Sequence, residues 1–170
     1  MRYTYIVTQA LVWRQDYPAD ALPKVIFGIL DMLLPLFKER FQGFWNNERQ
    51  AYSNPRGQAL VHVIHEFDSD RYYCSYRYRR QRNPYRYFEA TLHDNDGRVI
   101  LKNPIHDIEF FVQNGCFVSK SDFVSRGVRY INEAYLGEQY YHVKDQGFDL
   151  KTGKQLWGLD KDNFYEFDRT

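Results

Sequence analysis

The chain has 170 residues and a mass of 20.6 kDa, a length that fits one domain or two very small ones. Its 23 basic and 22 acidic residues leave a net charge of +1, and 44% of its residues are hydrophobic. These values exclude a disordered polyampholyte, a collagen-like repeat and a multipass membrane protein. The unusual feature is an aromatic share of 18%, in which 15 Tyr form the largest group.

The two cysteines, Cys74 and Cys116, allow one disulfide at most. The first 20 residues lack a basic segment followed by an uninterrupted apolar run, so we expect no secretory signal and a cytoplasmic protein with reduced thiols. The most apolar segment, residues 25–37, is much shorter than the roughly 20 residues of a membrane-spanning helix. We therefore expect no membrane role.

The first quarter of the chain predicts one strand and two helices. Partial alternation of apolar residues indicates a strand over residues 2–13. A helix is expected from residue 21, with Asp20 as its cap, and its apolar face includes Leu30 and Leu33. Because Pro35 would clash with the carbonyl four residues before it, we expect abutting helices over residues 21–34 and 35–47.

From residue 58 the pattern changes to strands. Alternating, β-branched or aromatic runs predict strands over residues 59–67, 71–81, 85–92 and 98–101. The clearest hairpin signal spans residues 108–118, where Asn114-Gly115 suits the two positive φ angles of a type I′ turn.

In the last third, a helix is expected after Ser119 or Ser121. Val124, Val128, Ile131 and Tyr135 recur at spacings of four, three and four, and Gly137 is a suitable residue to follow the helix. The tail alternates again over residues 140–144, 148–150, 155–157 and 164–167, with a turn at residues 151–154 that has Gly153 in a left-handed position.

These elements predict an α+β fold in a single domain, residues 1–170. We expect a mostly antiparallel, multi-stranded sheet, with two N-terminal helices and one helix in the C-terminal third packed on it. The helices cluster apart from most strands, and no linker is polar or long enough to mark a domain boundary.

No catalytic or cofactor motif is present. Gly147 to Gly153 followed by Lys154 has the wrong spacing for a phosphate-binding loop. On a strand, His62 and His65 would point to opposite faces and could not share a metal ion. We therefore expect no cofactor and no metal site.

One window stands out. Residues 71–88 hold six Arg and six Tyr and no acidic residue, so this segment is a cationic patch on a mildly acidic chain. Strand alternation assigns one face, with Tyr72, Cys74, Tyr76, Tyr78 and Arg80, to the core and leaves the other exposed. The expected binding surface is an Arg/Tyr-rich β-ribbon made of Tyr73, Arg77, Arg79, Arg82, Tyr85, Arg86 and Tyr87. The alternative is an inert ribbon, in which cross-strand Tyr–Arg pairs stabilise a solvated sheet.

Three functions follow from this ribbon and from the missing motifs. The leading hypothesis is a non-enzymatic binding protein of the inhibitor, immunity or adaptor type, whose ribbon contacts a protein with an acidic surface. The alternative is a module that binds single-stranded RNA or DNA through the same ribbon. A further alternative is an enzyme whose site combines Cys116 or a histidine with residues distant in sequence.

Overall fold

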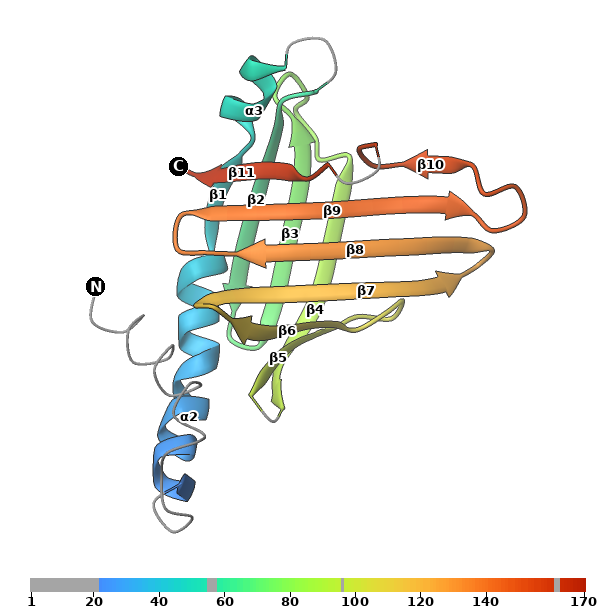
Figure 1. Cartoon of the computed structure of the whole chain (residues 1–170). Helices are drawn as coiled ribbons and strands as arrows, with labels where there is room; N and C mark the ends of the chain where they lie inside the picture. Colours follow the sequence, from blue (N-terminus) through green and yellow to red (C-terminus); the bar gives the residue numbers. More distant parts are fainter. Residues whose placement is uncertain (1–21, 55–57, 96, 161–162) are drawn as a thin grey trace.

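A computed structural model describes residues 22–54, 58–95, 97–160 and 163–170, with side chains from residue 32 onward. The predicted strand over residues 2–13 lies outside these residues. Figure 1 shows a long helix beside a set of strands in two crossing directions. Within the described part of the chain, no helix is long and apolar enough to cross a membrane.

The described strands form one continuous antiparallel sheet. Its order is β10-β9-β11-β1-β2-β3-β4-β5-β6-β7-β8, and β8 also pairs with β9, which closes ten of the strands into a barrel. The short β10 pairs with the far end of β9. The strands are β1 (Gly43–Asn46), β2 (Val61–Asp68), β3 (Arg71–Tyr78), β4 (Arg86–Asn95), β5 (Arg98–Lys102), β6 (Ile108–Gln113), β7 (Cys116–Ser125), β8 (Val128–Leu136), β9 (Tyr140–Asp149), β10 (Gln155–Trp157) and β11 (Tyr165–Arg169).

The barrel corrects the predicted α+β fold. The antiparallel pairing is as expected, but the sheet curves until β8 meets β9 along nine residue pairs, from Val128↔Asp149 to Leu136↔Tyr141. The described helices are α2 (Leu22–Phe41) and α3 (Glu48–Ser53), not three helices lying on an open sheet. A closed barrel has its core inside the sheet, so it needs no layer of helices to cover a face.

The helix in the C-terminal third was also predicted wrongly, because residues 121–125 lie in β7 and residues 128–136 lie in β8. Arg126 and Gly127 have φ angles of 49° and 78°, which turn the chain between these strands. Asn114-Gly115 makes the same kind of turn between β6 and β7, with φ angles of 50° and 78°, which confirms the predicted hairpin.

Helix α2 closes one end of the barrel. It continues past the exposed Pro35 as one helix, whereas two abutting helices were predicted, and residues 43–46 form β1 instead of helix. Leu33, Phe37 and Phe41 are spaced by one helical turn and are buried in the core. This packing offsets the loss of one helical hydrogen bond at the proline.

The helix is fastened to the hairpins at this closed end. Lys38 Nζ donates to the carbonyl of Ser69, at 2.5 Å, and Arg40 Nη1 donates to the carbonyl of Gly115, at 2.6 Å. Arg169, at the end of β11, donates to the carbonyls of Glu39 and Gln42. The carbonyls at the C-terminus of α2 therefore have partners from the last strand.

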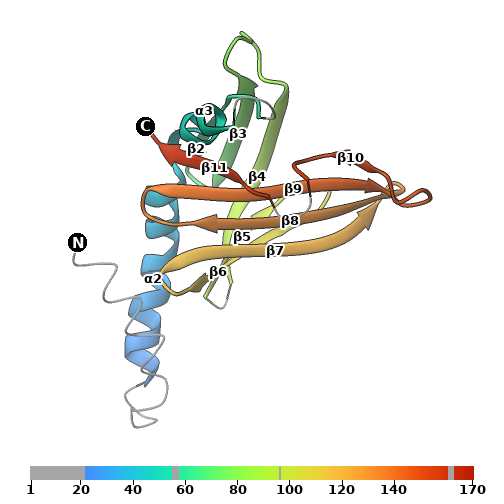
Figure 2. The same ribbon diagram turned by 45° about the horizontal axis from the view of Figure 1, so that its top comes forward.

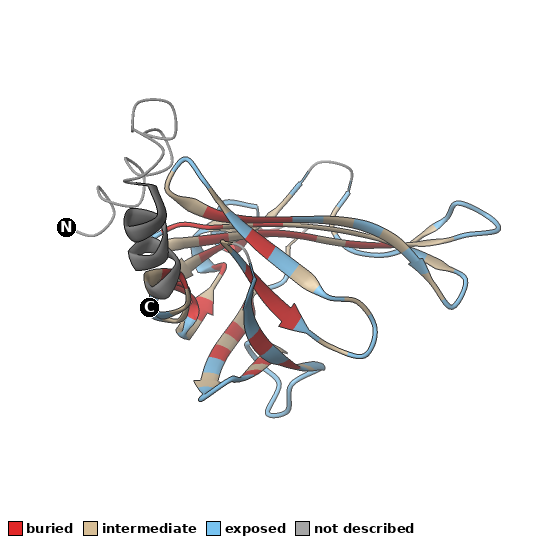
Figure 3. Ribbon diagram, turned by 90° about the horizontal axis from the view of Figure 1, so that it is seen from below, coloured by how far each residue is buried: buried red, intermediate tan, exposed pale blue. Residues whose placement is uncertain are grey.

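At the opposite end, β7, β8, β9 and β10 project beyond the rest of the barrel (Figure 2). Figure 3 shows that buried residues concentrate where the sheet closes on itself and give way to exposed ones along this projection. Val124, Leu150 and Leu156 are among its exposed apolar side chains. The projection, residues 121–132 and 145–157, is therefore partly solvated on both faces.

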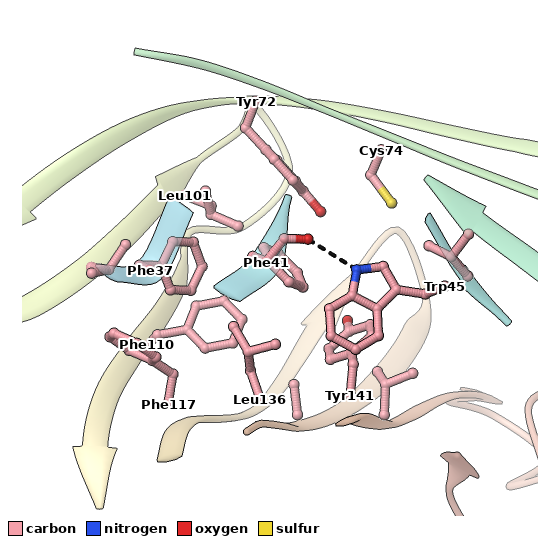
Figure 4. Packing of buried hydrophobic residues seen from close by; sticks show 14 of the residues in the cluster. Phe37, Phe41, Trp45, Tyr72, Cys74, Leu101, Phe110, Phe117, Leu136 and Tyr141 are labelled. Atoms are coloured by element: carbon pink, nitrogen blue, oxygen red, sulfur yellow. Dashed lines mark hydrogen bonds between the residues drawn. The ribbon is translucent and has the colours of Figure 1, made fainter. Parts of the chain in front are cut away.

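Aromatic side chains fill the closed half of the interior. Phe37 lies 5.0 Å from Phe110 and 5.1 Å from Phe117, between ring centroids, and Phe41 stacks 4.0 Å from His65. Trp45 is fully buried, and its Nε1 donates to the carbonyl of Phe41 at 3.0 Å (Figure 4). Much of the chain's aromatic excess is thus core.

Candidate functional site

The open half of the barrel contains a cavity of about 230 Å³. Its wall is mainly aromatic and aliphatic, with Phe41, Tyr141 and Phe167 toward the closed end. Trp157 and Gly158, which follow the projecting β9, also line it. A largely apolar cavity with a few polar groups is the usual form of a small-molecule site.

An ion pair is the main polar feature of the cavity. Arg86, on β4, forms a salt bridge with Asp145, on β9, and Asp145 Oδ1 also accepts a hydrogen bond of 3.2 Å from Asn132. Among the described residues that line the cavity, Arg86 is the single basic residue and Asp145 the single acidic one. The cavity therefore offers one carboxylate and one guanidinium, which balance each other in charge.

The surroundings of Arg86 keep it charged. Partial burial lowers its pKa, but the charge of Asp145 and its hydrogen bond, with a further electrostatic effect of Tyr76, outweigh burial and raise the pKa above its ordinary value. The guanidinium carbon also lies 5.6 Å from the centroid of the Tyr76 ring. The side chain of Arg86 is 47% exposed and that of Asp145 is 16% exposed. The pair thus lies at the cavity mouth, where a ligand can reach both groups.

The deeper wall carries neutral hydroxyl and thiol groups. Burial raises the pKa of the Cys74 thiol to about 12 and holds the pKa values of Tyr72 and Tyr76 well above the ordinary tyrosine value. Burial also lowers the pKa of His65 to about 3, and its Nδ1 lies 2.6 Å from Tyr72 Oη. At neutral pH these groups are uncharged, and the thiol of Cys74 is a poor nucleophile.

The other cysteine lies away from the cavity. Cys116 follows the β6–β7 turn at the closed end, and its Sγ is 2.9 Å from Tyr140 Oη. His62 and His65 point to opposite faces of β2, as predicted, with His65 inside the barrel. The described residues contain no group of three His, Cys, Asp or Glu that could hold a metal ion.

The structure divides the predicted ribbon residues between two faces. Tyr73, Arg77 and Tyr87 lie on the outer face, where the Tyr73 and Tyr87 rings are 6.4 Å apart. The inner set, Tyr72, Cys74 and Tyr76, faces the core as alternation predicted.

The other four ribbon residues lie at or near the mouth. Tyr85 stacks on Tyr78 at 4.5 Å and lines the cavity together with Arg86. Arg79 donates to Tyr52 Oη at 2.7 Å, and Arg82 is exposed in the turn between β3 and β4. Two of the seven ribbon residues, Tyr85 and Arg86, thus line the cavity.

Sequence reasoning missed Asp145, Asn132 and Trp157. For Asp145 the sequence does contain one signal, the alternation along β9. Tyr141, Val143 and Asp145 occupy every second position, so Asp145 shares the inner face with two core residues. A carboxylate at such a position is a candidate for a buried polar contact.

A second, more open hollow of about 860 Å³ lies on the outer wall of the barrel, between α3, β8, β9 and β11. Its walls are mostly polar and charged. Lys144 Nζ is 3.5 Å from Glu133 Oε1 and 4.8 Å from the centroid of the Phe164 ring, so this buried cation is already paired within the wall. We therefore place the candidate site in the barrel.

No family model and no curated protein matches the chain. Its fold is similar to that of the T-type phycobiliprotein lyase CpeT from Prochlorococcus phage P-HM1, with a TM-score of 0.68, 25% identity, and coverage of 84% of this chain and 98% of that one. It is also similar to the CRL protein of Arabidopsis, with a TM-score of 0.65, 14% identity, and coverage of 82% and 98%. The second likeness concerns the fold alone; the first joins this barrel to a protein named for its action on phycobiliproteins.

Proposed function

We propose that the protein binds an open-chain tetrapyrrole, a pigment of the bilin class, at the open end of the barrel. The observation that carries the proposal is the Arg86–Asp145 pair in the mouth of an otherwise aromatic cavity. A bilin is a conjugated molecule with pyrrole N–H donors along its chain and carboxylate side chains. It matches this cavity in both its apolar surface and its polar groups.

The two charged groups have separate roles in this proposal. Asp145 accepts hydrogen bonds from pyrrole N–H groups, while Asn132 holds one of its oxygens. Arg86 keeps Asp145 oriented and donates to an oxygen of the ligand, since a guanidinium has more N–H groups than one carboxylate can use. The similarity to a phycobiliprotein lyase supports a bilin over other apolar ligands, because phycobiliproteins are the proteins that carry bilins.

Titration with biliverdin tests the proposal. We expect saturable binding of one biliverdin per chain, with a change in its visible absorption and an induced circular dichroism signal. Asp145→Asn should weaken this binding about tenfold, or by about 1.4 kcal/mol, which is typical for the loss of a hydrogen bond to a charged group. Asp168→Asn, which removes an exposed carboxylate of β11 that pairs with Arg49, is the matched control.

A long-chain fatty acid serves as the contrasting ligand, because it is apolar and has no N–H donor. The proposal is contradicted if biliverdin does not bind saturably, or if Asp145→Asn and Asp168→Asn bind it equally well. A fatty acid that binds more tightly than biliverdin would identify the barrel as a lipid site instead.

We also propose that the exposed turn beside the mouth docks an acidic protein. Arg80 and Arg82 are exposed and take part in no ion pair among the described residues, and the stacked Tyr78 and Tyr85 lie next to them. Arg and Tyr are the residue types that most often dominate protein interfaces. A protein that receives a bilin from this barrel would have to approach this rim.

The test uses a phycobiliprotein subunit without its pigment, at low and high salt. The double variant Arg80→Glu with Arg82→Glu should abolish a salt-dependent interaction, whereas Arg126→Glu, at the exposed β7–β8 turn, should not. Equal binding by both variants would contradict docking at this turn. Binding of single-stranded RNA in place of the subunit would favour the nucleic-acid alternative.

A further inference from the structure

The inner faces of β7, β8 and β9 change in character along the strands. Toward the closed end one row across these strands is Ser119, Ala134 and Val143, all buried. The next row outward is polar, with Ser121, Asn132 and Asp145. The third row is Phe123, Tyr130 and Gly147, and it belongs to the projection.

The third row is covered by Trp157, which is directly opposite Gly147 in the β9–β10 pair. A Cβ atom added to Gly147 would lie 2.2 to 2.4 Å from three atoms of the Trp157 six-membered ring. The indole therefore lies against the backbone of Gly147 with one face. Trp157 is 38% exposed and lines the cavity, so its other side is accessible from the mouth.

Two further rings stand beside this indole. Tyr130 meets Trp157 edge-on, with centroids 5.4 Å apart and planes at 61°. Phe123 stacks on Tyr130 at 4.8 Å and is covered on its other face by His106, at 3.9 Å. The faces of Phe123 are thus occupied, whereas Trp157, beside Tyr130, remains partly exposed.

The cavity is too small for the whole proposed ligand. Its 230 Å³ falls below the range of about 300 to 1,000 Å³ in which drug-sized ligands are enclosed, and a bilin has four pyrrole rings. Successive rows on one face of a strand are about 7 Å apart, so a ligand that reaches past the polar row meets the third row next. In the polar row, Ser121 Oγ is buried and has no hydrogen-bond partner within the described part of the chain.

We infer that the ligand site continues out of the barrel onto Trp157, which stacks on the outer part of a bilin whose inner part occupies the cavity. This inference rests on the proposed function and adds the orientation of the ligand. Asp145 contacts the middle of the ligand, Trp157 covers the next conjugated ring, and Tyr130 borders it. Gly147 is a positioning residue, because it provides the space in which the indole lies.

The test compares a whole ligand with half of one. Biliverdin has four rings, and a dipyrrinone has two and fits within the enclosed part of the site. Trp157→Ala should weaken biliverdin binding at least tenfold and dipyrrinone binding by a much smaller factor, because the indole borders the cavity with one part and the outer ligand rings with the rest. Trp157→Phe should restore most of the biliverdin affinity, because it keeps an aromatic face.

Leu156→Ala is the matched control, since Leu156 is the neighbouring residue, is 49% exposed and does not line the cavity. The inference is overturned if Trp157→Ala binds biliverdin as tightly as Leu156→Ala, or if it loses both ligands to the same degree. If the wild-type protein binds neither ligand, the proposed function itself has failed. Asp145→Asn should weaken both ligands, which separates the role of the polar row from that of the indole.

Discussion

At the end of the barrel where α2 enters, the inner faces of β7 and β8 carry Phe117 and Leu136, both fully buried. At the other end the same strands carry Phe123 and Tyr130, both half-buried. The paired strands are continuous between these two ends. The difference teaches that one strand pair can contribute to stability at one end and to binding at the other. The backbone pairing is the same along both strands, so the side chains of each inner pair can differ without disturbing the next pair.

At the closed end, contacts between distant segments hold the helix in place. Hydrogen bonds from Lys38, Arg40 and Arg169 tie α2 to two hairpins and the last strand. At the open end, the contacts between segments include the Arg86–Asp145 pair and the packing of Trp157 on Gly147. Substitutions at the two ends should therefore separate stability from ligand affinity.

The largest effect is expected from Phe41→Ala at the closed end. Phe41 is 1% exposed and packs against Phe37, His65 and Tyr141, so its removal leaves a large void. We expect a loss of about 3 to 5 kcal/mol in the free energy of unfolding, measured by urea denaturation. A loss below about 1 kcal/mol would contradict the role of α2 as the plug of the barrel.

The second prediction concerns pH and His65, also at the closed end. Burial lowers the pKa of His65 to about 3 in the folded protein, whereas an exposed histidine has a pKa of 6.5. Below pH 6.5 the unfolded chain therefore binds a proton that the folded chain does not. Stability from this residue is therefore complete above pH 6.5 and falls as the pH decreases toward 3. Between pH 7 and pH 5 the loss is about 2 kcal/mol.

The measurement is urea unfolding at pH 7 and pH 5 for the wild-type protein and for His65→Gln, which keeps a polar group near Tyr72 Oη. The variant should lose less stability between the two pH values, by about 2 kcal/mol. Other titrating groups affect both proteins alike and cancel in this difference. Equal losses would show that His65 takes up a proton within the fold.

The sequence predicted individual strands better than their assembly. The Asn114-Gly115 turn carries its own conformational signal, and alternation correctly placed Tyr72, Cys74 and Tyr76 inside. In contrast, Val124, Val128, Ile131 and Tyr135 fit a helical spacing by coincidence, since they lie on two strands joined by a turn. Local patterns decide turns and faces, but helix and strand periods overlap in short segments.

Barrel closure and the site depend on contacts that no local pattern records. Closure requires β1 to pair with β11, for example Trp45 with Arg169, across most of the chain. Arg86 was predicted as a binding residue on an exposed ribbon, whereas its partner Asp145 is 59 positions away. The predicted ribbon therefore includes two residues of the cavity wall, Tyr85 and Arg86, whereas Asp145 on the opposite wall could not be found without the fold.

The smallest effect on stability is expected from Gly147→Ala at the open end. A Cβ atom at this position would lie 2.2 Å from the Trp157 ring, so the indole must move away from β9. We expect a loss of about 1 kcal/mol in the free energy of unfolding, at the lower end of the overpacking range, because the indole is partly exposed and can shift. Biliverdin affinity should fall severalfold, and the fluorescence of Trp157 should shift to longer wavelength as the ring becomes more exposed.

A control for the other tryptophans introduces Gly147→Ala into the Trp157→Phe variant. Because Trp157 is absent there, the shift in fluorescence should vanish. Gly153→Ala is the matched control in the same hairpin: its φ of 69° makes alanine strained, but a Cβ atom there meets nothing within 4 Å. It should cost a similar amount of stability, about 1 kcal/mol, through backbone strain and leave both the fluorescence and the biliverdin affinity unchanged. If Gly147→Ala and Gly153→Ala change the affinity for biliverdin equally, the open end binds its ligand without the indole. The two ends of the barrel would then differ in solvent exposure but not in their roles.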